Sequence, residues 1–455
     1  ATEVAASSGR NFRYRRYRHS AVHGAAVKQL PACVCQPPQM AINLYRQIAK
    51  TSASSTARLR AGCQAVPVSA VYDSHAPEPS EAPAKRWRCA NRAELMHRVS
   101  SAAFRQGAFE QEVVLLQHPR AELSTLPGLD EILRENWIDH GSRGGHRPSN
   151  GQRALCFVDR SFVAAAPAVG RSSAVVDGSA VGAALDRGHT LISHAVQLWS
   201  AATAELCLQL SDSLGRTTNA NLYCCGADLP AALAAHNDAQ CVFVWQLEGS
   251  KRWRIWLREA AMLPVDDRRV FGKHRDRQLE LHCLGQPDMT LSLHPGDVMY
   301  LPRGAIHATD TTGGTQGGSP SVHLTVGVDS WSVADFTTGQ QLPALTMPQV
   351  VHRVLSRSTS VSSSSQQQWR AIAQHLQDSV VFRRSLPVGG EDKHSEWTQA
   401  ARDAMKELSL VHDVASMCLN EQEVHDAVQE LCEEHTEKLE TWRAAMKTLA
   451  SGGNK

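Results

Sequence analysis

A series of short apolar segments between positions 219 and 328 constrains the fold of this chain more than any other feature. The segments CVFVWQL and RWRIWL are separated by EGSK, which is typical of a hairpin turn, and HPGD forms a second tight turn further on. Additional strands are predicted at NANLYCC, LELHCL, MTLSL, VMYLP and SVHLTVGV. Short strands with turn residues at this spacing predict an antiparallel barrel or sandwich.

The segments on either side of this β-rich stretch have helical periodicity. Apolar residues recur at three- and four-residue intervals over 189–214, which predicts an amphipathic core helix. The pattern becomes helical again after residue 340 and is clearest over 420–450, where an apolar stripe needs a partner surface in the chain or in another subunit. Further helices are predicted at 93–104 and 126–136, with a strand at 113–118 between them.

Length and composition allow a large folded body. The chain has 455 residues, of which 42% are hydrophobic, so a sizeable core is expected. No run of about 18 apolar residues occurs, and we therefore expect no membrane span. The 12 cysteines are scattered without the spacing of zinc ligands, which favours reduced, structural thiols.

Positive charge is concentrated at the beginning of the chain. Residues 1–90 contain thirteen Lys and Arg against four Asp and Glu, and are rich in Ala and Ser. This composition is typical of a mitochondrial targeting region, with the nucleus or nucleolus as the alternative location. The run RYRRYR at 13–18 fits contact with RNA or a large complex, because arginine neutralises phosphate and tyrosine stacks on bases; a solvated tail is the other interpretation. Residues 74–85 are predicted to be a linker.

Three side chains in the β-rich stretch point to metal chemistry. His236 and Asp238 are two residues apart, so they share one face if they lie in or beside an extended strand. His307 follows another predicted strand and can converge on them inside a barrel. Two histidines and one carboxylate can hold Fe(II) on one face and leave the opposite face open. An HxD pair alone is a weak signal, and its context of turns and strands strengthens it.

Lys251 is the second candidate in this stretch. It is the last residue of EGSK, at the start of the strand that follows the turn, and alternation places it on the face opposite Arg252. A lysine facing the interior of a barrel is costly unless an anion pairs with it, so an inward Lys251 predicts a carboxylate ligand. The alternative is that Lys251 points outward beside its arginine neighbours.

These segments together resemble the JmjC family of 2-oxoglutarate oxygenases and, within it, the ribosomal oxygenase branch. The resemblance covers roughly residues 100–335 and rests on NANLY (219–223), HND (236–238), VWQLEGSKRWRIW (244–256), PGDVMYLPRGAIH (295–307) and SVHLTV (321–326). It implies a mainly β fold with flanking helices, a double-stranded β-helix of the cupin or jelly-roll type. It also implies Fe(II) bound by His236, Asp238 and His307, and 2-oxoglutarate contacted by Lys251 and Asn221.

Two positions depart from the family pattern. Ala239 replaces a second acidic residue after the HxD pair, and Gly327 stands where the family usually has a hydroxyl residue. Loss of that hydroxyl is expected to weaken cosubstrate binding by the value of one hydrogen bond, about 0.5–1.5 kcal/mol. His323 matches a family histidine and is expected to be structural.

The expected organisation is a basic extension over 1–90, a JmjC domain over 91–335 and a C-terminal helical region over 336–455 that serves dimerisation or docking. The resemblance implies an Fe(II)- and 2-oxoglutarate-dependent protein hydroxylase that acts on a ribosomal or other translation protein. The alternative is a weakly active or inactive structural subunit of a large mitochondrial assembly, either the ribosome or a respiratory complex. A homodimer or membership of a complex is expected in either case.

Overall fold

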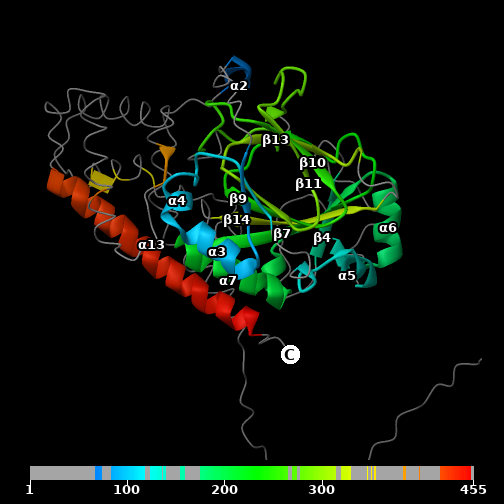
Figure 1. The fold of residues 1–455 in the computed structure, drawn as a ribbon, viewed down its shortest axis with the longest axis horizontal. Helices are drawn as coiled ribbons and strands as arrows, with labels where there is room; N and C mark the ends of the chain where they lie inside the picture. The colour runs from blue at the N-terminus through cyan, green and yellow to red at the C-terminus, as the bar shows by residue number, and fades with distance from the viewer. Residues whose placement is uncertain are drawn as a thin grey trace, which may run out of the picture. The chain divides into compact units, whose positions relative to one another are not determined.

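The structure is a computed structural model in which β-strands of the described residues form two sheets (Figure 1). The described residues are 67–73, 84–117, 123–135, 137–139, 154–158, 175–264, 269–273, 277–313, 319–328, 346, 350, 353–354, 383–385, 399 and 421–451. The larger sheet contains, in spatial order, β1 (Lys85–Arg88), β2 (Val114–Gln117), β12 (Asp297–Leu301), β9 (Cys241–Glu248), β14 (Ser321–Val328), β7 (Thr218–Cys225), β6 (Thr190–Ser193), β4 (Ala154–Val158), β3 (Trp137–Asp139) and β5 (Val175–Val176). The smaller sheet contains β11 (Met289–Leu293), β10 (Lys251–Trp256), β13 (Ile306–Asp310) and β8 (Leu233–His236).

The order of the strands identifies the architecture. From β7 to β14 the chain crosses to the other sheet after each strand except between β10 and β11, which are both in the smaller sheet. As a result, β12, β9, β14 and β7 lie side by side in one sheet and β11, β10, β13 and β8 in the other. This is the connectivity of a double-stranded β-helix, in which two antiparallel sheets face each other. The prediction of a mainly β fold of this type with flanking helices is confirmed.

Apolar residues fill both sides of the larger sheet. On its inner face, Val242 and Val244 of β9 pack with Trp253 and Ile255 of the smaller sheet. On its outer face, residues such as Phe243 of β9 join a core that includes the helices. Strand β9 is therefore buried on both faces, which explains its nearly continuous apolar sequence.

The helices of the described residues are α2 (Ser69–Asp73), α3 (Arg92–Ser100), α4 (Ala102–Arg105), α5 (Leu129–Arg134), α6 (Gly178–Asp186), the 3-10 helix η3 (Val196–Leu198), α7 (Ala201–Leu214) and α13 (Glu421–Ala450).

The long C-terminal helix α13 finds its partner surface within the chain. Leu439, Trp442 and Met446 belong to the same core as the inner residues of α7. Arg443 forms an ion pair with Asp212 of α7, with 3.0 Å between Nε and Oδ1. The predicted C-terminal helix is confirmed, and it lies beside α7 (Figure 1). The side chains of its apolar stripe are buried by the chain itself.

Two secondary-structure predictions were wrong. Only 201–214 of the predicted helix over 189–214 is α-helical, because the run TLIS is fully buried as strand β6 between β4 and β7. The segment LELHCL is not a strand; Leu279 and Leu284 instead pack with Trp256 and Ile306 against the smaller sheet. Both segments are short apolar runs whose pattern suits more than one backbone conformation, and tertiary packing decides between them.

The sheet begins before the predicted domain boundary at residue 91. Strand β1 pairs in parallel with β2, and Val71 of α2 is buried against the smaller sheet, although both lie in the predicted extension. The run at 13–18 and the break at 359–368 lie outside the described residues. Within the described part of the chain, the cysteines are free thiols and no helix combines the length and apolarity needed to span a bilayer.

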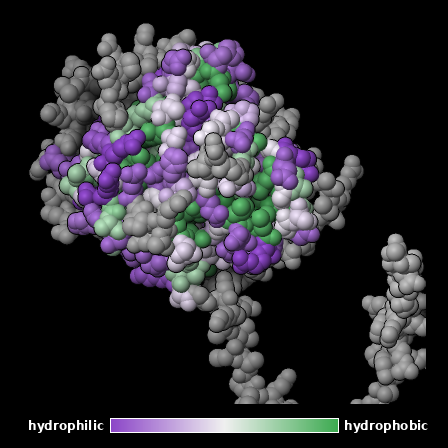
Figure 2. Space-filling model, turned by 45° about the vertical axis from the view of Figure 1, so that its right-hand side comes forward, coloured by the Kyte–Doolittle hydropathy of each residue, from purple (hydrophilic) through white to green (hydrophobic). Residues whose placement is uncertain are grey.

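Hydrophilic and hydrophobic residues are interspersed over the face drawn in Figure 2. Among the described residues, Leu133 of α5 is the large hydrophobic side chain that is exposed. The apolar groups of the described helices and strands are therefore largely covered by the chain itself.

Candidate metal centre

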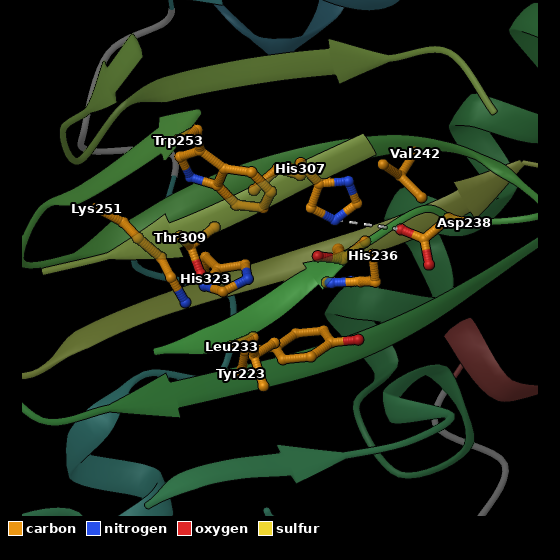
Figure 3. A pocket seen from close by; sticks show the side chains of 12 residues that line it. Tyr223, Leu233, His236, Asp238, Val242, Lys251, Trp253, His307, Thr309 and His323 are labelled. Atoms are coloured by element: carbon orange, nitrogen blue, oxygen red, sulfur yellow. Dashed lines mark ion pairs between the residues drawn. The ribbon is translucent and has the colours of Figure 1, made fainter. Parts of the chain in front are cut away.

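Two histidines face each other across a pair of strands in the smaller sheet. His236 ends β8 and His307 lies in β13, and the two are direct partners in the antiparallel pairing of these strands. Their ring centroids are 4.2 Å apart. Asp238 follows β8 by two residues and turns its carboxylate toward the same point, with Oδ2 at 3.7 Å from Nε2 of His307 (Figure 3). One potential ligand atom from each of the three residues lies within 4.8 Å of the others.

Backbone carbonyl groups fix the orientation of both imidazoles. Nδ1 of His236 lies 2.8 Å from the carbonyl oxygen of Ala234, and Nδ1 of His307 lies 3.1 Å from that of Ala305. A carbonyl oxygen can only accept a hydrogen bond, so each Nδ1 carries the proton and each Nε2 carries the lone pair. Metal-binding histidines are commonly oriented by such contacts.

The electrostatics of the three groups also suit a divalent cation. Burial lowers the pKa of both His236 and His307, so the imidazoles are held neutral. Burial alone would raise the pKa of Asp238, but the charge and hydrogen bond of Lys273 hold that pKa below its ordinary value. Neutral imidazole and ionised carboxylate are the forms in which these side chains bind a metal.

A pocket between the two sheets extends from the three residues to Lys251 (Figure 3). Lys251 is only 1% exposed, and within the described part of the chain its Nζ has no hydrogen-bond partner. Three other residues of the pocket lining also have a buried polar atom without a hydrogen-bond partner among the described residues. These atoms are Thr309 Oγ1, His323 Nδ1 and Trp253 Nε1. A buried cation without an anion is costly, and the donors around it fit a carboxylate-bearing ligand.

The inward orientation predicted for Lys251 is therefore what the structure has. Asn221 is not among the residues that line the pocket. Its Oδ1 accepts a hydrogen bond from the backbone N–H of Ala195 and lies 3.3 Å from Nδ1 of His194. Tyr223, two residues further along β7, lines the pocket instead.

Several pocket residues were missed by sequence reasoning. Thr309 follows His307 by two residues and Thr325 follows His323 by two, so strand alternation from the recognised histidines could have found both. Tyr223 stacks on His323 with 4.9 Å between ring centroids and 5° between ring planes. His323, expected to be structural, thus packs in the wall of the pocket, and its Nδ1 has no hydrogen-bond partner among the described residues.

Crowding around β14 explains why glycine occupies position 327. A Cβ at this position would lie 2.6 Å from Oδ1 of Asn219 and 2.5 Å from Oε1 of Gln240. These two amides hydrogen-bond to each other over 3.0 Å. The hydroxyl that was expected to be missing from this strand is available from Thr325, which lines the pocket.

Residues 197–336 match the family model described as JmjC domain. They form a JmjC domain. All three candidate metal ligands and Lys251 lie within it.

The relatives of this domain are considerably longer proteins. Over 130 residues the chain is 31% identical to the bifunctional lysine-specific demethylase and histidyl-hydroxylase NO66 of Dictyostelium discoideum, covering 29% of this chain and 23% of that protein. Over 231 residues it is 28% identical to ribosomal oxygenase 1 of Bos taurus, covering 49% of this chain and 30% of the relative. The matched regions thus span less than a third of either relative.

Among solved structures, the chain is similar to ycfD of E. coli. The TM-score is 0.32 at 14% sequence identity, and the match covers 62% of this chain and 68% of that one. At these values the likeness adds nothing to the strand order, which identifies the double-stranded β-helix, or to the family match over residues 197–336.

Proposed function

We propose that this protein is an Fe(II)- and 2-oxoglutarate-dependent oxygenase that hydroxylates a protein side chain. The observation that carries the proposal is the combination, in one pocket, of a two-histidine, one-carboxylate site with a buried and unpaired lysine. This ligand set with an open face is the arrangement of non-haem iron(II) oxygenases. The lysine supplies the counter-charge for a dicarboxylate that also reaches the metal.

Each residue then has a definite task. His236, Asp238 and His307 would hold Fe(II), which together with 2-oxoglutarate and O2 supplies the oxidising chemistry and yields succinate. Lys251 would pair with the distal carboxylate of 2-oxoglutarate, and Thr309 of the smaller sheet and Thr325 of the larger sheet offer hydroxyl groups in the same pocket. The apolar lining restricts the access of water to the reacting atoms, which strengthens each of these polar contacts.

A ribosomal or other translation protein is the substrate class that we propose. Support comes from the similarity to proteins named ribosomal oxygenase, one of which matches over 49% of this chain. A mitochondrial location, with RNA or complex contact through the basic residues of 1–90, is proposed on composition alone. Most of that extension lies outside the described residues.

The alternative of an inactive structural subunit fits the pocket less well. A subunit that only docks into an assembly gains nothing from Lys251, whose buried charge lowers stability in the absence of an anion. The helix α13 is also covered by α7, and is not an open apolar docking face.

The test is a turnover assay with the full chain, Fe(II), 2-oxoglutarate and a mixture of ribosomal proteins from mitochondria or cytosol. We expect release of succinate, and one added oxygen atom on a single protein by mass spectrometry. The variant Asp238→Ala should abolish both signals, whereas His294→Ala, at an exposed position of the same domain, should retain them. Absence of bound iron together with absence of succinate would overturn the proposal.

A further inference from the structure

Lys273 contacts one of the three candidate metal ligands directly. Its Nζ forms an ion pair with Oδ1 of Asp238, and the two side chains are 37% and 22% exposed. The other carboxylate oxygen, Oδ2, is the one that lies 3.7 Å from Nε2 of His307. The two oxygens of Asp238 therefore have different surroundings, one beside the lysine and one toward the histidines.

Asn237 holds the segment that carries Lys273. This residue lies between the two candidate ligands His236 and Asp238 and is completely buried. Its side-chain Oδ1 accepts a hydrogen bond of 2.7 Å from the backbone N–H of Phe271, and its Nδ2 donates one of 2.8 Å to the carbonyl oxygen of Arg269. Its own backbone N–H donates to the carbonyl oxygen of Phe271. The segment 269–273 is thus fastened to the HxD sequence by both backbone and side chain.

Gly272 brings this segment close to the metal-binding strand. Its φ is +83°, and a Cβ here would collide with the backbone of Ala235 and His236. Only glycine adopts this conformation and this close approach without strain. The lysine that follows is consequently delivered to Asp238 from a backbone that is fixed relative to the two ligands.

From this geometry we infer that Lys273 is a positioning residue that restricts Asp238 to binding the metal through a single oxygen. The inference rests on the proposed function. A carboxylate can bind a cation through one or both oxygens, and a second oxygen would occupy a position that 2-oxoglutarate or O2 needs. By holding Oδ1, Lys273 leaves Oδ2 as the ligand atom and keeps the open face of the site available.

A neutral side chain at position 273 would weaken cosubstrate binding in two ways. Oδ1 would lose its partner and could turn toward the cation. The site would also lose one positive charge that favours the approach of an anionic cosubstrate. Arginine can replace lysine here in both respects, because it carries the same charge and several donors.

The experiment loads the full chain with Co(II) as a spectroscopic substitute for Fe(II) and records the visible absorption bands, which report the number and arrangement of ligands. We expect the bands of Lys273→Met to differ from those of the wild type and those of Lys273→Arg to coincide with them. Binding of 2-oxoglutarate to the Co(II) proteins, measured by calorimetry, should weaken about tenfold in Lys273→Met and stay close to wild type in Lys273→Arg. Lys85→Met is the matched control, because Lys85 also pairs with a carboxylate, that of Glu112, but does not line the pocket.

The outcomes separate this inference from the proposed function. Coincident bands for the wild type and Lys273→Met, or bands of Lys273→Arg that match those of Lys273→Met, would overturn the role of Lys273 and leave the oxygenase proposal intact. A wild-type protein that binds no Co(II) would overturn both. If Lys273→Met does not fold, as judged by circular dichroism, Lys273→Ala replaces it with the same expected outcomes.

Discussion

His236 and His307 are partners in the hydrogen-bonded ladder between β8 and β13, and their rings lie 4.2 Å apart. The register shifts immediately after His307, between that residue and Thr309. Because both histidines stand on paired strands, the distance between them is set by the sheet and not by a flexible loop. A site built on such elements is organised before the metal arrives.

Removal of one of these histidines should abolish metal binding without unfolding the protein. In His307→Ala, we expect the affinity for Mn(II) or Co(II) to fall by more than about a hundredfold, since a direct ligand is lost and outer contacts alone account for factors of 10–100. Equilibrium dialysis with metal analysis measures the effect. His294→Ala is the control, and equal metal content in both variants would contradict the assignment of His307.

Lys251→Met should weaken cosubstrate binding without lowering the stability of the ligand-free protein. In the wild-type protein the buried Nζ has no partner among the residues that the structure describes, so the free energy of unfolding without ligands should stay the same or rise by roughly 1–3 kcal/mol in the variant. The thermal stabilisation given by 2-oxoglutarate to the metal-loaded protein should be lost. Urea unfolding and thermal shift measure the two quantities. A large loss of stability in the ligand-free variant would show that Lys251 has a structural partner.

The β-rich half of the fold was predictable because strand alternation and turn residues agree there. Lys251 and Arg252 illustrate this, since alternation alone placed them on opposite faces of the strand, and their burial shows that Lys251 points inward and Arg252 outward. The run TLIS was mistaken for part of a helix because four consecutive apolar or small residues carry no period of their own. Its conformation is fixed by its neighbours β4 and β7, which lie far from it in the sequence order.

The site was predictable only in part, for a related reason. His236, Asp238 and His307 have a recognisable spacing and context, whereas Lys273 has neither. Lys273 reaches Asp238 through the hydrogen bonds between Asn237 and the segment 269–273. Such a contact depends on tertiary structure. Asn221 was assigned from its place in NANLY; its Oδ1 contacts His194 and Ala195, and it is not among the residues that line the pocket.

Restoring a hydroxyl at position 327 should not improve cosubstrate binding. Gly327→Ser would force its Cβ against Asn219 and Gln240, so we expect a loss of about 1–3 kcal/mol in stability from overpacking. Thr325→Val, which removes the hydroxyl that does line the pocket, should weaken 2-oxoglutarate binding by about 0.5–1.5 kcal/mol. Calorimetry with the metal-loaded proteins compares the two. Tighter binding in Gly327→Ser would contradict this interpretation.

The stability of the ligand-free protein should fall as the pH is lowered from 7 to 5. Burial, with a smaller effect from Lys251, holds the pKa of His323 well below its ordinary value, and burial also lowers those of His236 and His307. Below about pH 6.5 the unfolded chain binds protons at these residues that the folded chain does not, so folding becomes less favourable as the pH decreases.

Replacement of His323 tests this dependence at a residue outside the metal ligands. Phe at this position keeps a flat ring for stacking on Tyr223, and Gln keeps a polar side chain, but neither titrates. The slope of the unfolding free energy against pH, measured by urea unfolding, should therefore be smaller in both variants. The decrease should reach up to about 1.4 kcal/mol per pH unit between pH 6.5 and the lowered pKa of His323. Because Phe and Gln differ in packing but share the loss of the proton, an equal flattening in both identifies titration as the cause. A slope identical to that of the wild type would mean that His323 is not held neutral in the folded protein.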